Sequence, residues 1–372
     1  MNEDRTHRRM GGVRPLPALL ALGLLGMALC LVLPVSPARA AGWSDRNGDG
    51  VVDLVDLALF SQQELGQEWS AVDWCDWSAT PHKHEKQLLD LLDFVDRFFH
   101  CALADPLVLR NANKYPTRLA WGPGAQQLYV TDARANAVFV YAADASLVAT
   151  GELKGLGTPL GIAVDASGKL YVGNNGRDNV EVYSPDGVRV AILGAGTLQM
   201  PNDLAFDASG RLYVVDSRSN CVFVFDPATG QSLGSIGAAE LRFPSALAIA
   251  GAELFVADQG NHLIRVYDLN GTLLRSLGGE VGQGMLGYKW QGKFIRLQGL
   301  AVDAAGRLHA LDSHMGVIQI LNASTGGFLT SYATQGAAPG QLDLPLGMAL
   351  NAAGAMAVAN TQNQRIELLT PP

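Results

Sequence analysis

Apolar and polar positions alternate in short runs that recur along residues 112–370. Residues 161–174, 203–216 and 299–312 each hold an apolar run, an Asp-x-x-Gly turn, a second alternating run and a terminal Asp or Asn. Residues 118–132, 246–258 and 347–360 depart from the turn and keep the rest of the unit. Alternation with a period of two, bounded by Gly and Asp, is typical of half-buried strands. We therefore predict a strand on either side of each turn.

The unit recurs six times, and this recurrence decides the predicted fold. Its terminal residues are Asp132, Asn174, Asp216, Asp258, Asp312 and Asn360. The first four stand 42 residues apart, and the later intervals are 54 and 48 residues. A third strand ending in an apolar pair follows each terminal residue, and a fourth follows in five units. Such regular short strands predict an all-β propeller, whose blades bury their faces against one another.

The sixth unit ends after its third strand, at Leu369-Thr370-Pro371-Pro372. The short apolar run Leu107–Arg110, which precedes the first unit, can supply the missing fourth strand. An unpaired strand edge invites aggregation, so pairing these two segments would close the ring and cover that edge.

The repeats resemble a known family in their sequence as well as in their spacing. PLGIAVD (159–165), GKLYVGN (168–174), PSALAIA (244–250) and ELFVADQGNHLIRVYDLNG (253–271) are similar to NHL repeats. The resemblance covers nearly all of residues 112–370. It implies a six-bladed NHL-type β-propeller, which we place at residues 105–372.

Composition and charge narrow the possible functions. Gly accounts for 42 of 372 residues, as expected of a chain rich in turns. Only 17% of the residues are charged, the net charge is −8 and no Lys/Arg stripe is present, which excludes a disordered chain and a basic nucleic-acid binder. The acidity is uneven, because residues 41–104 contain 12 acidic and 4 basic side chains.

A twelve-residue run in this acidic segment has the pattern of a calcium loop. Oxygen-bearing side chains occupy loop positions 1, 3, 5, 9 and 12, and the carbonyl of Val51 would ligate from position 7; the predicted ligands are Asp45, Asn47, Asp49, Val51, Asp53 and Asp56. Calcium prefers several hard oxygen ligands, and Gly50 allows the sharp turn at position 6. The alternative is an Asp/Asn/Gly turn that caps a helix. Apolar spacing after the loop and from Leu88 to Phe99 predicts helices.

Asp56 followed by Leu57 resembles a type I dockerin repeat. The resemblance implies that residues 41–104 form a small helical dockerin-like calcium-binding module, and that the module docks on a cohesin-like partner. Dockerins carry two such repeats and only one is found, so docking stays open. Cys75 and Cys101 are the two cysteines of this segment, and we predict a disulfide between them in an exported protein.

Residues 1–40 have the pattern of a secretory signal peptide. Four arginines precede an apolar run from Leu16 to Val35, and Ala38-Arg39-Ala40 offers a cleavage site. We therefore predict a secreted, periplasmic or cell-surface protein whose mature chain is not inserted in a membrane. The run is long enough that an uncleaved anchor is the alternative.

Candidate ligand-binding residues fall in two places. Arg118, Asn202, Asp203 and Gln298 stand where the innermost strands begin, so they would line the central channel; the alternative is that they satisfy backbone groups there. The insertion Gly279–Phe294, with Tyr288 and Trp290, looks like a binding loop or a disordered insertion. The terminal Asp/Asn ring recurs in every unit and is therefore expected to be structural.

Three functions are consistent with these features. We expect an exported, monomeric binding protein that recognises a protein or glycan. The dockerin resemblance implies that it belongs to an extracellular assembly that degrades polysaccharides. A lyase-like or lactonase-like propeller enzyme with a metal in the channel is the first alternative. A zinc site would need several matched His residues, and His262, His309 and His314 stand at unmatched repeat positions. A calcium cluster would need a Glu beside Asn202 and Asp203, and no matching Glu is found. A calcium-stabilised surface scaffold is the second. No catalytic residue is predicted, and Ca²⁺ is the predicted cofactor.

Overall fold

The structure is a computed structural model that describes residues 107–109, 115–142, 149–281 and 290–372. The chain divides into two units, Met1–Ala102 and Leu103–Pro372, and every described residue belongs to the second. The predicted signal (1–40), the dockerin-like module (41–104) with its calcium ligands and cysteines, and Tyr288 lie outside the described residues. Within the described part, no helix has the length and apolar character needed to cross a membrane.

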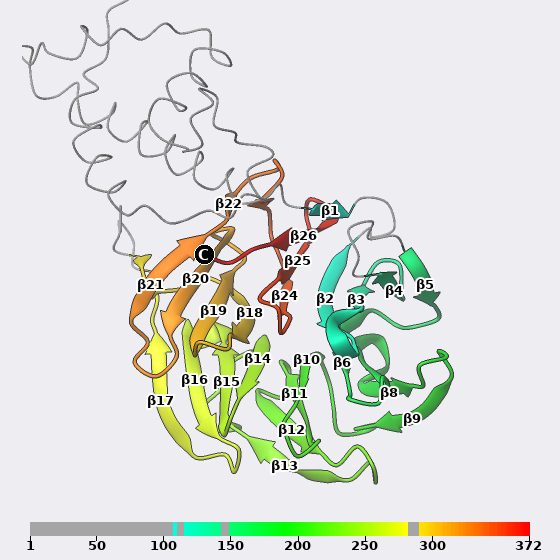
Figure 1. The fold of residues 1–372 in the computed structure, drawn as a ribbon. Helices are drawn as coiled ribbons and strands as arrows, with labels where there is room; N and C mark the ends of the chain where they lie inside the picture. Colours follow the sequence, from blue (N-terminus) through cyan, green and yellow to red (C-terminus); the bar gives the residue numbers. More distant parts are fainter. Residues whose placement is uncertain (1–106, 110–114, 143–148, 282–289) are drawn as a thin grey trace, which may run out of the picture. The chain divides into compact units, whose positions relative to one another are not determined.

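Six four-stranded antiparallel sheets stand around one axis (Figure 1), which confirms the predicted six-bladed all-β propeller. Blade 1 consists of β2 (Pro116–Trp121), β3 (Gln127–Asp132), β4 (Ala137–Ala142) and β5 (Ala149–Leu153). Blade 2 consists of β6 (Pro159–Val164), β7 (Leu170–Asn174), β8 (Asn179–Tyr183) and β9 (Arg189–Leu193). Blade 3 consists of β10 (Pro201–Phe206), β11 (Leu212–Asp216), β12 (Cys221–Phe225) and β13 (Ser232–Ile236). Blade 4 consists of β14 (Ala246–Ala250), β15 (Glu253–Asp258), β16 (Leu263–Asp268) and β17 (Leu273–Gly278). Blade 5 consists of β18 (Leu297–Val302), β19 (Arg307–Asp312), β20 (Val317–Asn322) and β21 (Phe328–Tyr332).

Blade 6 closes the ring in the way that the sequence predicts. It combines β24 (Gly347–Leu350), β25 (Met356–Asn360) and β26 (Arg365–Leu369) with β1 (Leu107–Leu109). Strand β1 pairs antiparallel with β26, and Val108 lies opposite Glu367. Segments from opposite ends of the propeller sequence thus form one sheet, and β26 is not left as an edge.

The turns between the first two strands of a blade explain the Asp-x-x-Gly motif. In blade 3, Asp207 Oδ1 accepts hydrogen bonds from the backbone N–H groups of Ser209 and Arg211, at 2.9 Å each. Gly210 has a φ of +85°, a conformation that a residue with a Cβ adopts only at a cost. The side chain of Asp and the freedom of Gly together hold the tight connection between β10 and β11.

The apolar core lies between neighbouring blades, because the alternating strands present one face to each neighbour. One cluster joins Phe255 and Ile264 of blade 4 to Leu300 and Leu308 of blade 5. Similar clusters fill the other spaces between blades and include the fully buried Tyr213 and Tyr267. Cys221 is buried in β12 without a disulfide, as its position in a strand suggests.

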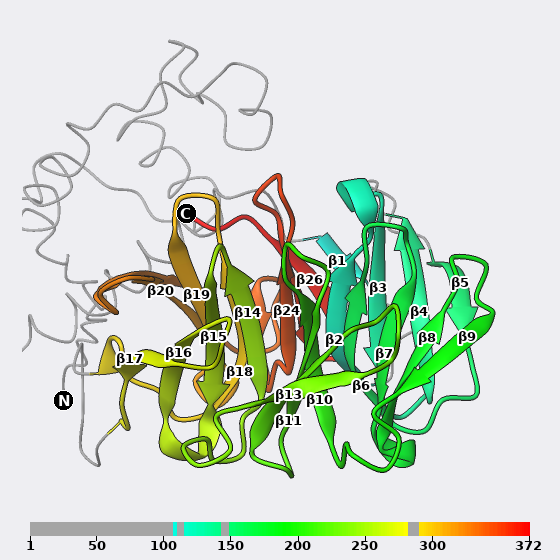
Figure 2. The ribbon, with the colours of Figure 1, turned by 90° about the horizontal axis from the view of Figure 1, so that it is seen from below.

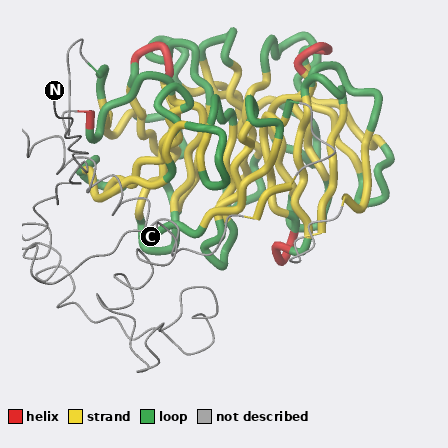
Figure 3. The backbone as a smooth tube through the Cα atoms, turned by 90° about the horizontal axis from the view of Figure 1, so that it is seen from above, coloured by secondary structure: helices red, strands yellow, loops and turns green. Residues whose placement is uncertain are grey.

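The strands run between two faces, and the connecting loops gather at both (Figures 2 and 3). We call the face where the innermost strands begin and the six terminal residues lie the Asp/Asn face. Two single-turn 3₁₀ helices, η3 (Asn175–Arg177) and η4 (Gln259–Asn261), belong to its loops, whereas η2 (Pro123–Ala125) lies on the opposite face. The small parallel pair β22 (Thr334–Gln335) and β23 (Gln341–Leu342) lies within the connection from blade 5 to blade 6.

Candidate functional site at the propeller axis

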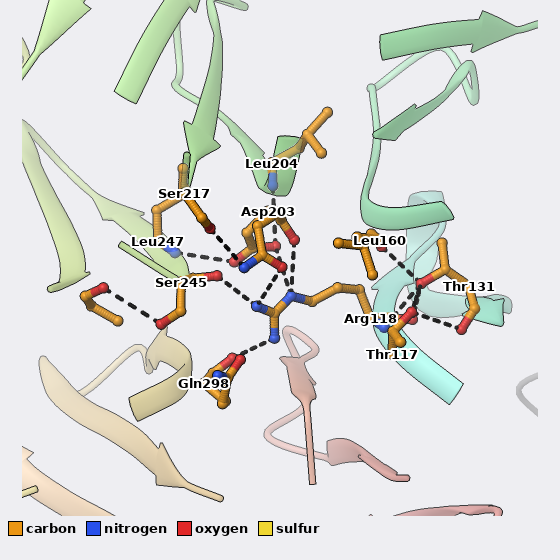
Figure 4. A network of polar contacts seen from close by, with 12 residues as sticks. Thr117, Arg118, Thr131, Leu160, Asp203, Leu204, Ser217, Ser245, Leu247 and Gln298 are labelled. Atoms are coloured by element: carbon orange, nitrogen blue, oxygen red, sulfur yellow. Dashed lines mark hydrogen bonds and ion pairs between the residues drawn. The ribbon is translucent and has the colours of Figure 1, made fainter. Parts of the chain in front are cut away.

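The four candidate channel residues meet at the axis, although 180 residues separate the first from the last. Figure 4 labels three of them, Arg118, Asp203 and Gln298. Arg118 comes from β2 of blade 1, Asn202 and Asp203 from β10 of blade 3, and Gln298 from β18 of blade 5. Each stands at the start of an innermost strand, so the propeller brings them to one point. The closed ring therefore places all four residues at the axis, and their role in binding a ligand stays a prediction.

Arg118 occupies the centre of this group. Its Nε donates to the carbonyl oxygen of Asn202 at 3.1 Å, and its guanidinium also donates to the carbonyl oxygens of Ser245, at 2.5 Å, and of Gln298. These carbonyls belong to blades 3, 4 and 5. One side chain of blade 1 thus joins three other blades across the axis, and it is only 4% exposed.

Asp203 is the acidic partner of Arg118, with 3.8 Å between Nε and Oδ1. Its other carboxylate oxygen accepts the backbone N–H of Leu247 in blade 4 at 3.0 Å. Burial raises the pKa of Asp203 and lowers the pKa of Arg118, and the attraction between the two opposes both changes. Removing two charges from water is costly, so the carbonyl contacts of Arg118 are needed to stabilise its position.

Further polar contacts link blades 1, 3 and 4 to the beginning of the innermost strand of the next blade. The Oγ1 of Thr131 donates to the carbonyl oxygen of Leu160 at 2.8 Å, and the Oγ of Ser217 donates to that of Pro244 at 2.6 Å. Ser245 Oγ donates to the Leu297 carbonyl at 2.7 Å. These contacts hold the beginnings of the innermost strands of blades 2, 4 and 5 against the preceding blade.

The alternative prediction of a metal in the channel can be tested on the donor atoms. Calcium needs several oxygen ligands, and the axial oxygens come from Asn202, Asp203, Ser245 and Gln298. Each of these residues already contacts the guanidinium of Arg118. No group of three or more His, Cys, Asp or Glu side chains within the described ranges is placed to hold a metal. The axial residues therefore fit an internal cation and do not fit an added divalent ion while Arg118 is in place.

The terminal Asp/Asn ring is structural, as the sequence predicts. All six side chains are fully buried. Each accepts at least one hydrogen bond from the backbone of the loop that leads into its own blade: the Asp216 carboxylate accepts from Met200 at 2.9 Å, and Asn360 Oδ1 accepts from Asp343 at 2.8 Å. These residues bind the loops of the Asp/Asn face and are not presented to a ligand.

Trp290 lies apart from the axial residues. Its ring packs edge-on against Phe328 of β21, the outermost strand of blade 5, with 6.1 Å between the ring centroids. The adjacent backbone is held by Gln319 of β20, which accepts from the N–H of Gly292 at 2.8 Å and donates to the carbonyl of Lys293 at 2.7 Å. The described end of the insertion is therefore anchored at the side of blade 5.

Two buried polar groups were not predicted from the sequence. In blade 6, Arg365 and Glu367 form an ion pair in which both side chains are at most 7% exposed. In blade 5, His309 contacts Asp303 at 3.3 Å and the Tyr332 hydroxyl at 3.2 Å. The sequence holds one indication of each group. Glu367 stands between apolar residues of β26, and His309 stands where blades 2 and 3 have Tyr171 and Tyr213.

Comparison with known sequences supports the repeat assignment. The NHL repeat matches residues 198–225. This segment runs from the loop before β10 to the end of β12, and so contains Asn202, Asp203 and the buried Asp216. No curated protein matches the chain.

Solved structures share the fold at low sequence identity. A hydrazine synthase from Kuenenia stuttgartiensis matches with a TM-score of 0.53 and 15% identity, over 71% of this chain and 97% of that one. A gluconolactonase from Xanthomonas campestris matches with a TM-score of 0.54 and 20% identity, over 73% and 93%. At these identities the likeness establishes the propeller architecture alone, since one fold serves many functions.

Proposed function

We propose that this chain is an exported binding protein, which recognises a protein or glycan through the loops of the Asp/Asn face. The observation that carries the proposal is the filling of the axis by Arg118 and its partners in blades 3, 4 and 5. An axis occupied by the protein's own cation offers no open site for a reacting molecule. The loops around it, which a rigid propeller positions, are the usual place for recognition in such a scaffold.

The N-terminal part of the proposal comes from the sequence. Residues 1–40 direct export, and residues 41–104 bind one calcium ion through Asp45, Asn47, Asp49, Val51, Asp53 and Asp56. The dockerin-like segment then attaches the propeller to an extracellular assembly through a cohesin-like module, and the Cys75–Cys101 disulfide stabilises it. Calcium titration of the full chain and of Asp45→Ala plus Asp49→Ala tests the metal site, and stoichiometric binding by both proteins would refute it.

The binding function is tested by replacing exposed apolar residues on the Asp/Asn face and, for comparison, on the outermost strands of the blades. Phe243 and Leu344 lie on the Asp/Asn face and are 41% and 39% exposed, whereas Leu274 and Leu329 lie on outermost strands and are 48% and 51% exposed. The full chain is screened against a displayed peptide library and a panel of polysaccharides. Ala at the first two positions is expected to abolish capture, and Ala at the second two to preserve it. The reverse pattern would refute the assignment of the Asp/Asn face.

An enzyme of the lactonase kind is the second candidate. The likeness to a gluconolactonase and the polar axis with Asp203 favour it. The assay is lactone hydrolysis by the full chain in added calcium or zinc. Turnover that disappears in Asp203→Asn and persists in Asp268→Asn, a change at the half-buried end of β16, would establish the enzyme and overturn the binding proposal.

A further inference from the structure

The arginines of the propeller divide into two groups by their contacts. Most form an ion pair with a carboxylate; these are Arg118, Arg177, Arg189, Arg211, Arg265, Arg275, Arg307 and Arg365. Arg134 stacks over the ring of Tyr115 at 4.6 Å. Within the described ranges, the side chains of Arg218, Arg242 and Arg296 have neither a hydrogen bond nor an ion pair, and all three are exposed.

These three arginines belong to adjoining loops of the Asp/Asn face. Arg242 and Arg296 hold equivalent positions in blades 4 and 5, because their backbone N–H groups donate to the terminal Asp258 and Asp312. Arg218 follows the terminal Asp216 of blade 3 in the turn to β12. The exposed His314 occupies the position of Arg218 in blade 5.

Hydrogen bonds to backbone carbonyls connect these loops in series. The turn of Arg218 reaches the loop of Arg242, since Ser217 Oγ donates to the Pro244 carbonyl at 2.6 Å. The next contact is between Gly260 N–H and the Arg242 carbonyl at 2.8 Å. His262 then contacts the carbonyl of Ile295, beside Arg296, at 3.0 Å. We call Arg218, Arg242, Arg296 and His314 the basic arc.

Phe243 adds an apolar group to the basic arc, immediately after Arg242. Its ring is 41% exposed, and its backbone φ of +49° is unfavourable for a bulky residue. The side chain of Asn220 holds this conformation by accepting the Phe243 N–H at 2.7 Å. The same conformation recurs at Thr158 (φ +50°), whose N–H donates to Asn136 Oδ1 at 2.8 Å, so the repeat sets this backbone and what is particular to blade 4 is the exposed aromatic ring.

We propose that the basic arc and Phe243 bind an acidic peptide segment of a partner protein; this proposal rests on the binding function proposed above. Exposed guanidinium groups bind carboxylates with paired hydrogen bonds, and here they stand on a chain whose net charge is −8. An exposed Phe ring buries the most apolar area against an apolar side chain, and a peptide can place such a side chain next to its acidic residues. The observations therefore favour an acidic peptide over an acidic polysaccharide.

The probe is a short labelled peptide of alternating Glu and Leu, with a Gln/Leu peptide as its neutral counterpart. We expect the full chain to bind the acidic peptide and to bind the neutral one at least tenfold more weakly, with affinity falling as salt rises. Arg218→Gln, Arg242→Gln and Arg296→Gln should each weaken binding about three- to tenfold, because each removes one charge-assisted contact. The triple variant should lose measurable binding.

Arg134→Gln is the matched control, because Arg134 holds in blade 1 the position that Arg218 holds in blade 3 and lies outside the basic arc. Its affinity should equal that of the unchanged chain. If the triple variant bound the peptide as tightly as the unchanged chain, or if the unchanged chain did not bind it, the basic arc would not be the binding surface. Either result would leave the proposal of recognition elsewhere on the Asp/Asn face unaffected. Arginine-dependent binding of polygalacturonate in preference to the peptide would overturn the peptide and retain the surface. Phe243→Ala is measured separately, and a loss of binding in this variant as well as in the arginine variants supports the proposal. Unchanged binding in Phe243→Ala would show that the Phe243 ring does not contact the peptide.

Discussion

At the scale of single residues, Arg118 shows how a propeller can use a charged side chain in place of apolar packing. The axis is too narrow for large side chains from all six inner strands, and Gly161, Gly299 and Gly347 stand where a Cβ would meet the neighbouring strand. One long side chain enters this space and donates to carbonyls of three blades. Because Arg118 is buried with Asp203, the pair stabilises the fold only while both side chains and the three carbonyl groups remain.

Replacing Arg118 by Met is therefore expected to destabilise the propeller. The change keeps a long apolar chain but leaves Asp203 and three carbonyl groups without their cation. Breaking a buried pair from one side costs about 3–5 kcal/mol in the free energy of unfolding. Chemical denaturation measures this loss, and the double variant Arg118→Met plus Asp203→Leu should recover part of it. A single variant as stable as the unchanged chain would show that the axis does not depend on the guanidinium.

His309 gives a prediction on pH. Burial lowers the pKa of its imidazole, and the nearby Asp303 raises it by a smaller amount, so the folded protein holds His309 neutral below its usual range. A group with a lowered folded pKa contributes full stability above the unfolded pKa, about 6.5, and loses it as the pH falls towards the folded value. Thermal unfolding of the full chain should thus lose less stability below about pH 6.5 in His309→Gln than in the unchanged chain.

The exposed His314 supplies the comparison for this experiment. His314→Gln removes an imidazole from the same blade without removing a buried one. Its unfolding should keep the acid sensitivity of the unchanged chain. If both Gln variants show the same dependence on pH, the titrating group is not His309.

At the scale of elements, the third strands of blades 5 and 6 hold the loops that enter those blades. Equivalent positions carry Glu181, Arg265, Gln319 and Glu367 in blades 2, 4, 5 and 6. Gln319 binds the backbone at Gly292 and Lys293, and Glu367 accepts from the N–H of Gly340 at 2.9 Å. The two intervals longer than 42 residues precede blades 5 and 6, so the longest loops are anchored by these strands.

Gln319→Leu should loosen the loop before blade 5 and leave the propeller folded. It strands one buried N–H and one buried carbonyl, at a cost of about 1–3 kcal/mol. Hydrogen exchange at Gly292 and Phe294 should accelerate at least tenfold, with no change in β18. Gln362→Leu, an exposed change in blade 6, is the control. Unchanged exchange at Gly292 would mean that Gln319 does not anchor the loop.

The sequence predicts those parts of the elements that depend on local rules. Strand alternation, the Asp-x-x-Gly turns and the terminal ring follow from contacts within one repeat, and the structure confirms them. The convergence of Arg118 on Ser245 and Gln298 depends on the closed ring, which joins residues far apart in sequence. The pairing of Arg365 with Glu367 and of His309 with Tyr332 depends on rotamers and burial, which an alternating pattern does not specify. The sequence therefore places the axial residues but does not show that they bind one another.

At the scale of the whole propeller, closure depends on a three-residue strand. Strand β1 pairs with β26 through Leu107, Val108 and Leu109 and completes blade 6. Without it, β26 would expose an unpaired edge, and the first and last blades would be joined only by side-chain contacts such as that of Thr361 with the Pro116 carbonyl, at 2.7 Å. We therefore expect this short strand to contribute to the cooperative unfolding of the six blades.

A chain shortened to begin at residue 111 tests this role, and a chain that begins at residue 105 is its control. Loss of β1 removes a few ladder hydrogen bonds worth about 1 kcal/mol each, which for a domain of this size lowers Tm by roughly 5–10 °C. Because the bare edge of β26 can pair with other molecules, the shorter chain should also associate as its concentration rises. Calorimetry and light scattering at several concentrations measure the two effects. Identical melting and scattering would mean that the side-chain contacts between blades 1 and 6 suffice for closure, and that β1 only covers the surface of a ring that is already complete.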